Sequence, residues 1–269
     1  MSEASGYQIT ADAAKAREQY AVRYFMAPWA PVLVAAAALQ PGERVLDLAC
    51  GSGLVARVAA PHVGPTGRVT GLDINRSMLD VARSLPPPAG APVTWVQGSA
   101  EKMDLPDASF DVIVCQQGFQ FFLDKPAALR EMRRVISPGG RMLFSVWAGP
   151  GVYQREIAEG LERHIDPGVA RKFRLHRIVP SAGTLRDLLA ATGFRDVEIR
   201  QTAMNVQLPP MDSFLLGQLS GTPIAEAVAA ASADARAALV AHVKAALEPY
   251  TNRDGVSVPE EINLATARR

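Results

Sequence analysis

The chain has 269 residues and nearly balanced charge, with 28 Lys and Arg against 27 Asp and Glu. Because binding to a phosphate backbone requires a basic surface, we predict that the protein does not bind nucleic acid. The longest apolar stretch, 29–39, is well short of the ~20 residues of a membrane-spanning helix, and residues 1–10 do not resemble a secretory signal. We therefore expect a cytoplasmic protein. Cys50 and Cys115 are expected to be free thiols, and no metal site is predicted because neither has metal-ligand spacing.

Between about residues 40 and 150, strand patterns alternate with helical patterns, which is typical of a parallel sheet built from βαβ units. The predicted strands lie at 44–48, 69–72, 93–96, 110–114 and 142–147. Apolar residues with helical spacing fill the gaps at about 54–60, 77–84 and 129–136. Pro61 is expected to end the first of these helices, and the Pro-Gly-Gly sequence at 138–140 is expected to form a turn before the fifth strand.

After residue 150 the pattern changes. It predicts helices at about 152–165 and 182–192, a strand that starts near Phe194, a helix or helix pair at 224–248 and an edge strand at 261–267. We treat residues 1–269 as one domain with its core at about 40–204 and 253–269. The remaining segments are a helical insertion at about 205–252 and an N-terminal helical lid at about 10–38.

Two apolar groups are candidates for covering a substrate. A stripe within the insertion is expected to face inward over the pocket, and it consists of Ile224, Val228, Leu239 and Val243. The aromatic residues of the N-terminal segment fit either a lid or a simple anchor for that helix; they are Tyr20, Tyr24, Phe25 and Trp29.

The most informative segment is a strand that runs into a glycine turn and then a helix, at about 45–59. Gly51 and Gly53 lack a Cβ and so allow the backbone to approach a ligand, and the start of the helix presents unpaired N–H groups. Asp73 follows Gly53 by twenty residues, at the end of the second strand, where a carboxylate can accept hydrogen bonds from both hydroxyls of a ribose. The pattern predicts a nucleoside-containing ligand.

Two classes of cofactor fit this segment. Gly51-x-Gly53-x-x-Ala56 with a later acid also matches a nicotinamide dinucleotide fingerprint. However, Asp47 precedes the glycines by four residues and would repel a pyrophosphate. A carboxylate at this point suits the ammonium and sulfonium of S-adenosylmethionine. The alternative role for Asp47 is to cap the helix that follows the turn.

The Asp-Leu-Ala-Cys-Gly-Ser-Gly sequence at 47–53 resembles the first motif of class I S-adenosylmethionine-dependent methyltransferases, in particular the ubiquinone/menaquinone-biosynthesis-like group. Segments 71–75, 98–101, 109–111 and 129–140 are similar to the later motifs, so the resemblance extends in register over about 40–147. It implies an α/β fold with a doubly wound, seven-stranded, mostly parallel sheet. This is the Rossmann-like methyltransferase fold, here with a helical substrate-cover insertion.

The resemblance also implies S-adenosyl-L-methionine as the cofactor, with Asp73 on its ribose. The other residues implied at this site, besides Asp47, are Ala49, Cys50, Gly51 and Gly53 at the methionine part, Ile74 and Met78 beside the adenine, Ser99 and Ala100 with Gly98 at the adenine edge, and Cys115 and Gln116 near the methionine end. Ser99 departs from the family, which often has Asp there, and a neutral hydrogen bond is roughly half as strong as a charged one.

Methyl transfer from a sulfonium is an in-line displacement, which mainly requires alignment of the acceptor and exclusion of water. We expect O- or C-methylation of an apolar or aromatic metabolite. The candidates for a catalytic role are His164, His176 and Gln120, although many relatives carry His at the position of Gln120. The alternatives are a nicotinamide-dependent oxidoreductase and a non-methylating protein that uses the same cofactor pocket. A homodimer is left open.

Overall fold

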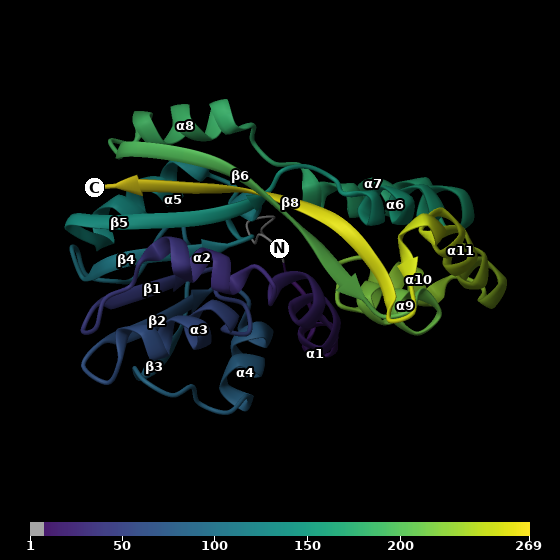
Figure 1. Ribbon diagram of the computed structural model, residues 1–269, viewed down its shortest axis with the longest axis horizontal. Coiled ribbons are helices and arrows are strands. Elements are labelled where there is room, and N and C mark those ends of the chain that lie inside the picture. The colour runs from purple at the N-terminus through teal and green to yellow at the C-terminus, as the bar shows by residue number, and fades with distance from the viewer. Residues whose placement is uncertain (1–7) are drawn as a thin grey trace.

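The computed structural model describes residues 8–269, except the side chain of His176, and its centre is an eight-stranded sheet (Figure 1). Strands β1 to β5 pair in parallel, whereas β8 lies antiparallel between β5 and β6. The seven strands predicted follow the order β3-β2-β1-β4-β5-β8-β6, which confirms the predicted fold class, and the two-residue β7, paired to β8, is an eighth strand that was not predicted. The strands are β1 (Arg44–Leu48), β2 (Arg68–Asp73), β3 (Val93–Gln97), β4 (Phe110–Gln116), β5 (Ile136–Trp147), β6 (Arg195–Leu208), β7 (Thr251–Asn252) and β8 (Gly255–Arg268).

Helices cover both faces of the sheet because successive strand residues point to opposite sides. Val45 belongs to the apolar cluster under α2 and α3, whereas the next residue, Leu46, belongs to the cluster under α5 and α8. Helix α4 packs against β2 and β3. The bounds of these helices are α2 (Ala30–Ala37), α3 (Leu54–Val63), α4 (Arg76–Ser84), α5 (Lys125–Val135) and α8 (Ala182–Ala191).

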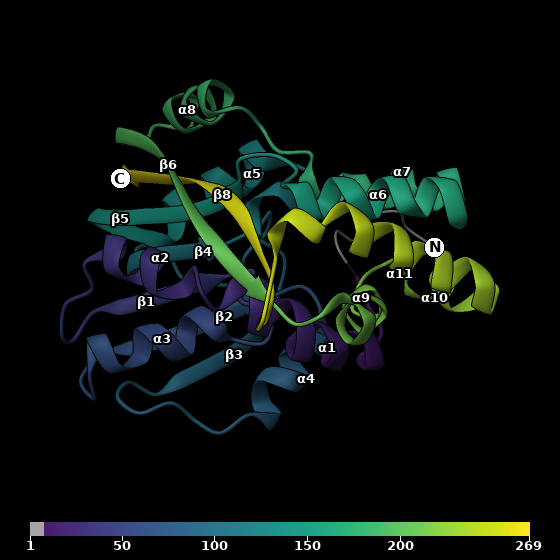
Figure 2. The same cartoon turned by 45° about the vertical axis from the view of Figure 1, so that its right-hand side comes forward.

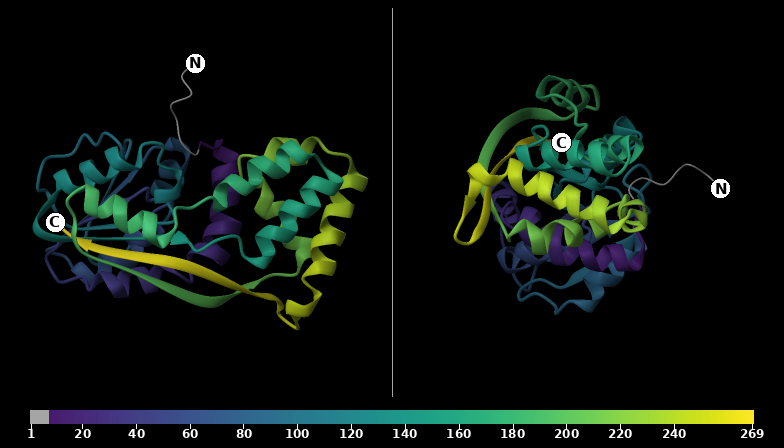
Figure 3. Two further views of the ribbon diagram at one scale, coloured as in Figure 1. Left: turned by 90° about the horizontal axis from the view of Figure 1, so that it is seen from above. Right: turned by 90° about the vertical axis from the view of Figure 1, so that its right-hand side faces the viewer.

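Strands β6 and β8 continue past their neighbours and carry a second layer of helices (Figures 2 and 3). The pairing of β5 with β8 stops at Trp147 and Ile262, but β6 and β8 stay paired as far as Leu208 and Val256. We call this second layer the helical cap. It consists of α6 (Val152–His164), α7 (Pro167–Arg174), α9 (Met211–Ser220), α10 (Ala225–Ala230) and α11 (Ala233–Ala246), and the 3₁₀ turn Glu248–Tyr250 leads back from α11 to the sheet.

The structure differs from the sequence prediction in several details of these elements. The predicted edge strand at 261–267 is wrong, because β8 is paired on both sides and the edge is β6. Pro61 does not end α3, which continues to Val63 and stops at Gly64, where φ is +65°. The 138–140 segment lies within β5 as an irregularity of the β4–β5 register.

The cap combines two separate segments of the chain, 152–174 and 211–246, rather than the insertion alone. Strand β6 extends to Leu208 because Val206 and Leu208 alternate with exposed polar residues and are themselves fully buried. Within residues 8–269, no helix combines the length and apolar character needed to cross a membrane.

The N-terminal segment joins the sheet layer to the cap. Helix α1 (Ala11–Arg17) continues into a π-helix (Glu18–Met26), and α1 contacts both α4 and α9. Phe214 of α9 is 1% exposed and contacts the rings of Tyr20, Tyr24 and Phe25. These aromatic residues therefore anchor the helix, as does Trp29, which is fully buried.

We expect Phe214→Ala to lower the free energy of unfolding by about 3–5 kcal/mol, because it empties a buried aromatic site. Urea denaturation followed by far-UV circular dichroism measures this change. Ser213→Ala is the matched control, since Ser213 is exposed on the same helix and should alter stability by less than about 0.5 kcal/mol. Equal effects of the two substitutions would show that this aromatic cluster does not hold the N-terminal segment in place.

Candidate active site

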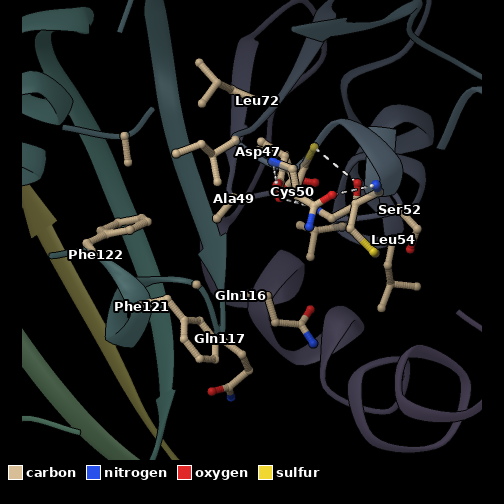
Figure 4. A pocket seen from close by; sticks show the side chains of 18 of the residues that line it. Asp47, Ala49, Cys50, Ser52, Leu54, Leu72, Gln116, Gln117, Phe121 and Phe122 are labelled. Carbon is tan, nitrogen blue, oxygen red and sulfur yellow. Dashed lines mark hydrogen bonds between the residues drawn. The ribbon is translucent and has the colours of Figure 1, made fainter. Parts of the chain in front are cut away.

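A cavity with an empty volume of about 1140 Å³ opens at the carboxyl ends of β1, β2 and β4 (Figure 4). The strand order reverses between β1 and β4, which is where doubly wound sheets bind ligands. Of the residues predicted at the cofactor site, all except Gly53 and Cys115 line this cavity. They are Asp47, Ala49, Cys50, Gly51, Asp73, Ile74, Met78, Gly98, Ser99, Ala100 and Gln116.

Asp73 ends β2 and is 8% exposed on the cavity wall. Its Oδ2 accepts a hydrogen bond from the N–H of Gly51, and its Oδ1 accepts one from the N–H of Asn75, both at 2.8 Å. Burial raises the pKa of Asp73, and these two hydrogen bonds oppose that rise. Since each carboxylate oxygen has a second lone pair, Asp73 can still accept hydrogen bonds from two ligand hydroxyls.

Asp47 lies on β1 and is 1% exposed. Its Oδ2 accepts a hydrogen bond of 2.8 Å from the N–H of Ala56 in the first turn of α3, so the helix-capping alternative is confirmed. Asp47 also lines the cavity, where a ligand can reach it. Burial raises the pKa of Asp47 to about 8, and the nearby charge of Asp73 adds to this rise. A cationic ligand would favour the ionised form of Asp47.

The raised pKa of Asp47 predicts how stability depends on pH. The folded protein keeps this proton up to about pH 8, whereas an unfolded chain releases it near the ordinary value of 3.8. Stability should therefore fall as the pH rises from about 4 to 8. We expect Asp47→Asn, which cannot ionise, to raise the melting temperature relative to the natural protein more at pH 8 than at pH 5.

Asp111→Asn is the control for this measurement. The guanidinium of Arg44 lowers the pKa of Asp111 through hydrogen bonds, so this pair is fully ionised at both pH values. The control should change the melting temperature by the same amount at pH 5 and pH 8. An Asp47→Asn effect that is equally independent of pH would contradict the raised pKa.

The two glycines of the turn have different roles. Gly51 has a φ of +55° and faces the cavity. Gly53 has a φ of +81° and lies outside the cavity lining. It faces Trp95 instead, since a Cβ on Gly53 would come within 2.1 Å of the indole ring. Gly53 therefore allows the indole to pack onto the turn, rather than allowing a ligand to approach as the sequence indicated.

Cys115 lies on β4 and Cys50 follows the neighbouring strand β1, but only the Cys50 thiol faces the cavity. Cys115 is fully buried and outside the lining, and burial raises its pKa to about 12. Cys50 lines the cavity, and burial raises the pKa of this thiol also. A ligand can shield Cys50 directly, whereas Cys115 is already enclosed by protein.

Several wall residues were not identified from the sequence. Arg17, Val22 and Met26 bring the N-terminal segment to the cavity, and Gln116 donates a hydrogen bond from Nε2 to the Met26 carbonyl at 2.7 Å. Glu101 also lines the cavity, and its Oε1 accepts hydrogen bonds from the N–H groups of residues 123 and 124. Glu101 was part of the recognised 98–101 segment, but the N-terminal residues carried no comparable motif.

A second cavity, with an empty volume of about 500 Å³, lies where the helical cap meets the sheet. Gln120 lines it from the 3₁₀ turn Phe119–Phe121 and is 9% exposed. The two cavities share Arg17, Met26, Gln117 and Phe121, so they meet at these residues. The remaining lining residues are aromatic or polar for the most part: Ala21, Phe25, Trp147, Gln154, Phe173, Arg177, Gln218 and Thr222.

A buried ion pair forms part of this second wall. Arg177 Nη1 lies 2.9 Å from Glu260 Oε2, and the guanidinium lies 3.8 Å from the centre of the Trp147 ring. Burial lowers the pKa of Arg177, and Glu260 opposes this shift. Arg177 therefore presents a polar group to the cavity, and the carboxylate of Glu260 offsets its positive charge.

Of the two histidines predicted as candidates for a catalytic role, only His164 has a described side chain. His164 ends α6, ten residues or about 15 Å along the helix from Gln154, and lines neither cavity. It lies instead beside His242, with ring centres 5.6 Å apart. The side chain of His176 is outside the described part of the structure; its backbone belongs to the 3₁₀ turn Leu175–Arg177.

The predicted apolar stripe does not face either cavity. Its residues are at most 5% exposed, but they pack into the cluster that joins α6 and α9 to α11; they are Ile224, Val228, Leu239 and Val243. The insertion contributes Gln218 and Thr222 to the second cavity instead. The stripe therefore builds the interior of the cap, because an apolar helix face that long packs against other helices.

The sequence of this chain is similar to those of known methyltransferases. Residues 46–144 match a family described as a methyltransferase domain. The ubiquinone/menaquinone biosynthesis C-methyltransferase UbiE of Ralstonia pickettii is 36% identical over 184 residues, which cover 63% of this chain and 74% of that one. The enzyme of the same name from Ectopseudomonas mendocina is 42% identical over 125 residues, which cover 46% of this chain and about half, 49%, of that relative.

Solved structures share the fold. Phosphoethanolamine N-methyltransferase 2 of Haemonchus contortus, in complex with S-adenosyl-L-methionine, superposes with a TM-score of 0.60 over 97% of this chain and 57% of its own. Its sequence is 21% identical, so it supports the architecture.

Proposed function

Because the chain belongs to the class I S-adenosylmethionine-dependent methyltransferases related to the ubiquinone/menaquinone biosynthesis C-methyltransferases, we propose that it methylates a small organic acceptor held in the second cavity. The observation that supports this placement is the junction of the two cavities at Arg17, Met26, Gln117 and Phe121. A cofactor in the first cavity and an acceptor in the second would meet there, with protein on the other sides.

The polar groups of the first cavity support its assignment to S-adenosyl-L-methionine. Asp73 is positioned to accept hydrogen bonds from the ribose hydroxyls, and Asp47 to face the positive charge of the methionine part. The bound cofactor supplies a methyl on a sulfonium, whose thioether leaves without protonation. Gly51 gives the turn its φ of +55°, which favours glycine, and it lies on the cavity wall beside Met78. Ser99 and Ala100 lie on the wall where the adenine edge is expected.

The second cavity favours an acceptor with a planar apolar part and polar substituents. Phe25, Phe121, Trp147 and Phe173 provide aromatic walls, and the amides of four glutamines provide donors and acceptors. The nearly neutral pair of Arg177 and Glu260 adds a polar end without strongly favouring either charge. We therefore propose O- or C-methylation of an apolar or aromatic metabolite.

The protein contributes mainly alignment and exclusion of water. The N-terminal segment and the 3₁₀ turn Phe119–Phe121 enclose the junction, so the acceptor atom can be held in line with the methyl. A general base is needed only if the acceptor must lose a proton of high pKa. Gln120 is placed to orient an acceptor, and His176 stays a prediction for the base. A cytoplasmic location and the absence of nucleic-acid binding also stay predictions, and a homodimer stays open.

We expect Asp73→Ala to weaken binding of S-adenosylhomocysteine by about 1.5–3 kcal/mol, or roughly 10- to 150-fold, because charged hydrogen bonds to the ribose are lost. Isothermal titration calorimetry measures this directly. Asp80→Ala removes an exposed carboxylate on α4 that lies outside the cavity and should leave the affinity unchanged. Unchanged binding in Asp73→Ala would remove Asp73 from the ribose site.

Methyl transfer itself is tested with methyl-labelled S-adenosylmethionine and a panel of phenols, enols, amines and activated carbon acids. We expect label in one or more apolar products, with one S-adenosylhomocysteine formed per methyl transferred. His176→Gln tests the base, because loss of a base removes the alkaline rise of kcat/KM and leaves cofactor binding intact. Binding of the cofactor with no labelled product across the panel would count against the proposed acceptor class. Binding of NADH without binding of S-adenosylhomocysteine would count against the cofactor site.

A further inference from the structure

Gln117 lies at the junction of the two cavities and lines both of them. It follows β4 directly, and its backbone N–H donates a hydrogen bond of 2.9 Å to the carbonyl of Ser145 on β5. Its side chain lies beside Phe121 in Figure 4, with Gln116 on the neighbouring part of the wall. A ligand in either cavity therefore comes close to Gln117.

The backbone of Gln117 has an unfavourable conformation for its residue type. Its φ is +53°, in the left-handed region that glycine and asparagine adopt most readily. The next residue, Gly118, is closely packed, since a Cβ on it would come within 2.6 Å of the Ala49 Cβ and 2.9 Å of the Cys115 Sγ. The close packing of this turn requires a glycine at 118, but it does not require a glutamine at 117.

The amide of Gln117 is buried without a hydrogen-bond partner. The residue is 4% exposed, and neither Nε2 nor Oε1 has a partner among the described residues 8–269. Gln120 Oε1, in the second cavity, is also buried and unpaired. Because most buried polar atoms in proteins are hydrogen-bonded, unpaired amide atoms on a cavity wall indicate that a ligand supplies the partner.

We infer that Gln117 is a positioning residue, whose amide hydrogen-bonds a hydroxyl or enol group of the acceptor beside the atom that receives the methyl. This inference rests on the proposed function. A hydroxyl both donates and accepts, so it can satisfy Oε1 and Nε2 of one amide, which a purely accepting ether or carbonyl cannot do. Gln120 Oε1 provides a second contact further into the cavity.

The test compares binding of 1-naphthol and of 1-methoxynaphthalene, whose oxygen cannot donate, to the full chain saturated with S-adenosylhomocysteine. Ligand-observed NMR titration gives both dissociation constants. We expect the natural protein to bind 1-naphthol at least about tenfold more tightly, because the ether leaves the buried amide oxygen unpaired. Gln117→Leu should remove this preference, and a titration of the same variant with S-adenosylhomocysteine checks that its cofactor site is still formed.

Gln117→Gly guards against misfolding, since glycine adopts a φ of +53° without strain. We expect this variant to melt at a higher temperature than the natural protein and still to lose the preference for 1-naphthol. A residue with a merely structural role would instead lower the melting temperature when replaced. Gln201→Leu is the matched control, because Gln201 is an exposed glutamine of β6 outside both cavities, and it should keep the preference.

Two results would overturn the inference while cofactor binding remains normal: equal affinity of the natural protein for the two probes, or a preference that survives in both Gln117 variants. Failure of S-adenosylhomocysteine to bind the natural protein would instead refute the proposed function. The two failures are therefore distinguishable.

Discussion

The burial of two carboxylates at the ends of adjacent parallel strands is the constraint on which the site depends. Asp47 and Asp73 each accept a backbone N–H from the segment that follows β1, so they fix the glycine turn and the start of α3. This arrangement costs stability in the free protein because burial disfavours the charged form of both groups. A cationic ligand with two hydroxyls reverses that cost, and S-adenosylmethionine has both features.

The helical cap is assembled from two segments that are far apart in the sequence. Helices α6 and α7 follow β5, whereas α9 to α11 come from the long connection between β6 and β8. One apolar cluster holds these helices together, and the polar residues of the second cavity lie where this cluster meets the sheet. If the acceptor binds in the second cavity as proposed, the cofactor site can remain constant while the cap residues determine which acceptor fits.

Two features that lower stability coincide directly after β4. A strained backbone and an unpaired amide meet at Gln117, where neither improves the packing of the free protein. Such features persist when the surrounding fold over-determines them, and the next residue, Gly118, is closely packed against Ala49 and Cys115. Replacing Gln117 separates the two properties experimentally.

The sequence alone determined the sheet core, because hydrophobic alternation and glycine or proline breaks are local signals that also set the order of the elements. It also identified many of the residues that line the first cavity, since the glycine turn and Asp73 lie within a few residues of strand ends. Contacts between distant segments were decided only by tertiary structure. Three features depend on which surfaces meet in space. They are the pairing of β8 with strands on both sides, the packing of Trp95 against Gly53, and the burial of the 224–243 stripe inside the cap rather than over a cavity. Periodicity shows that a face is buried, but it does not show which partner buries it.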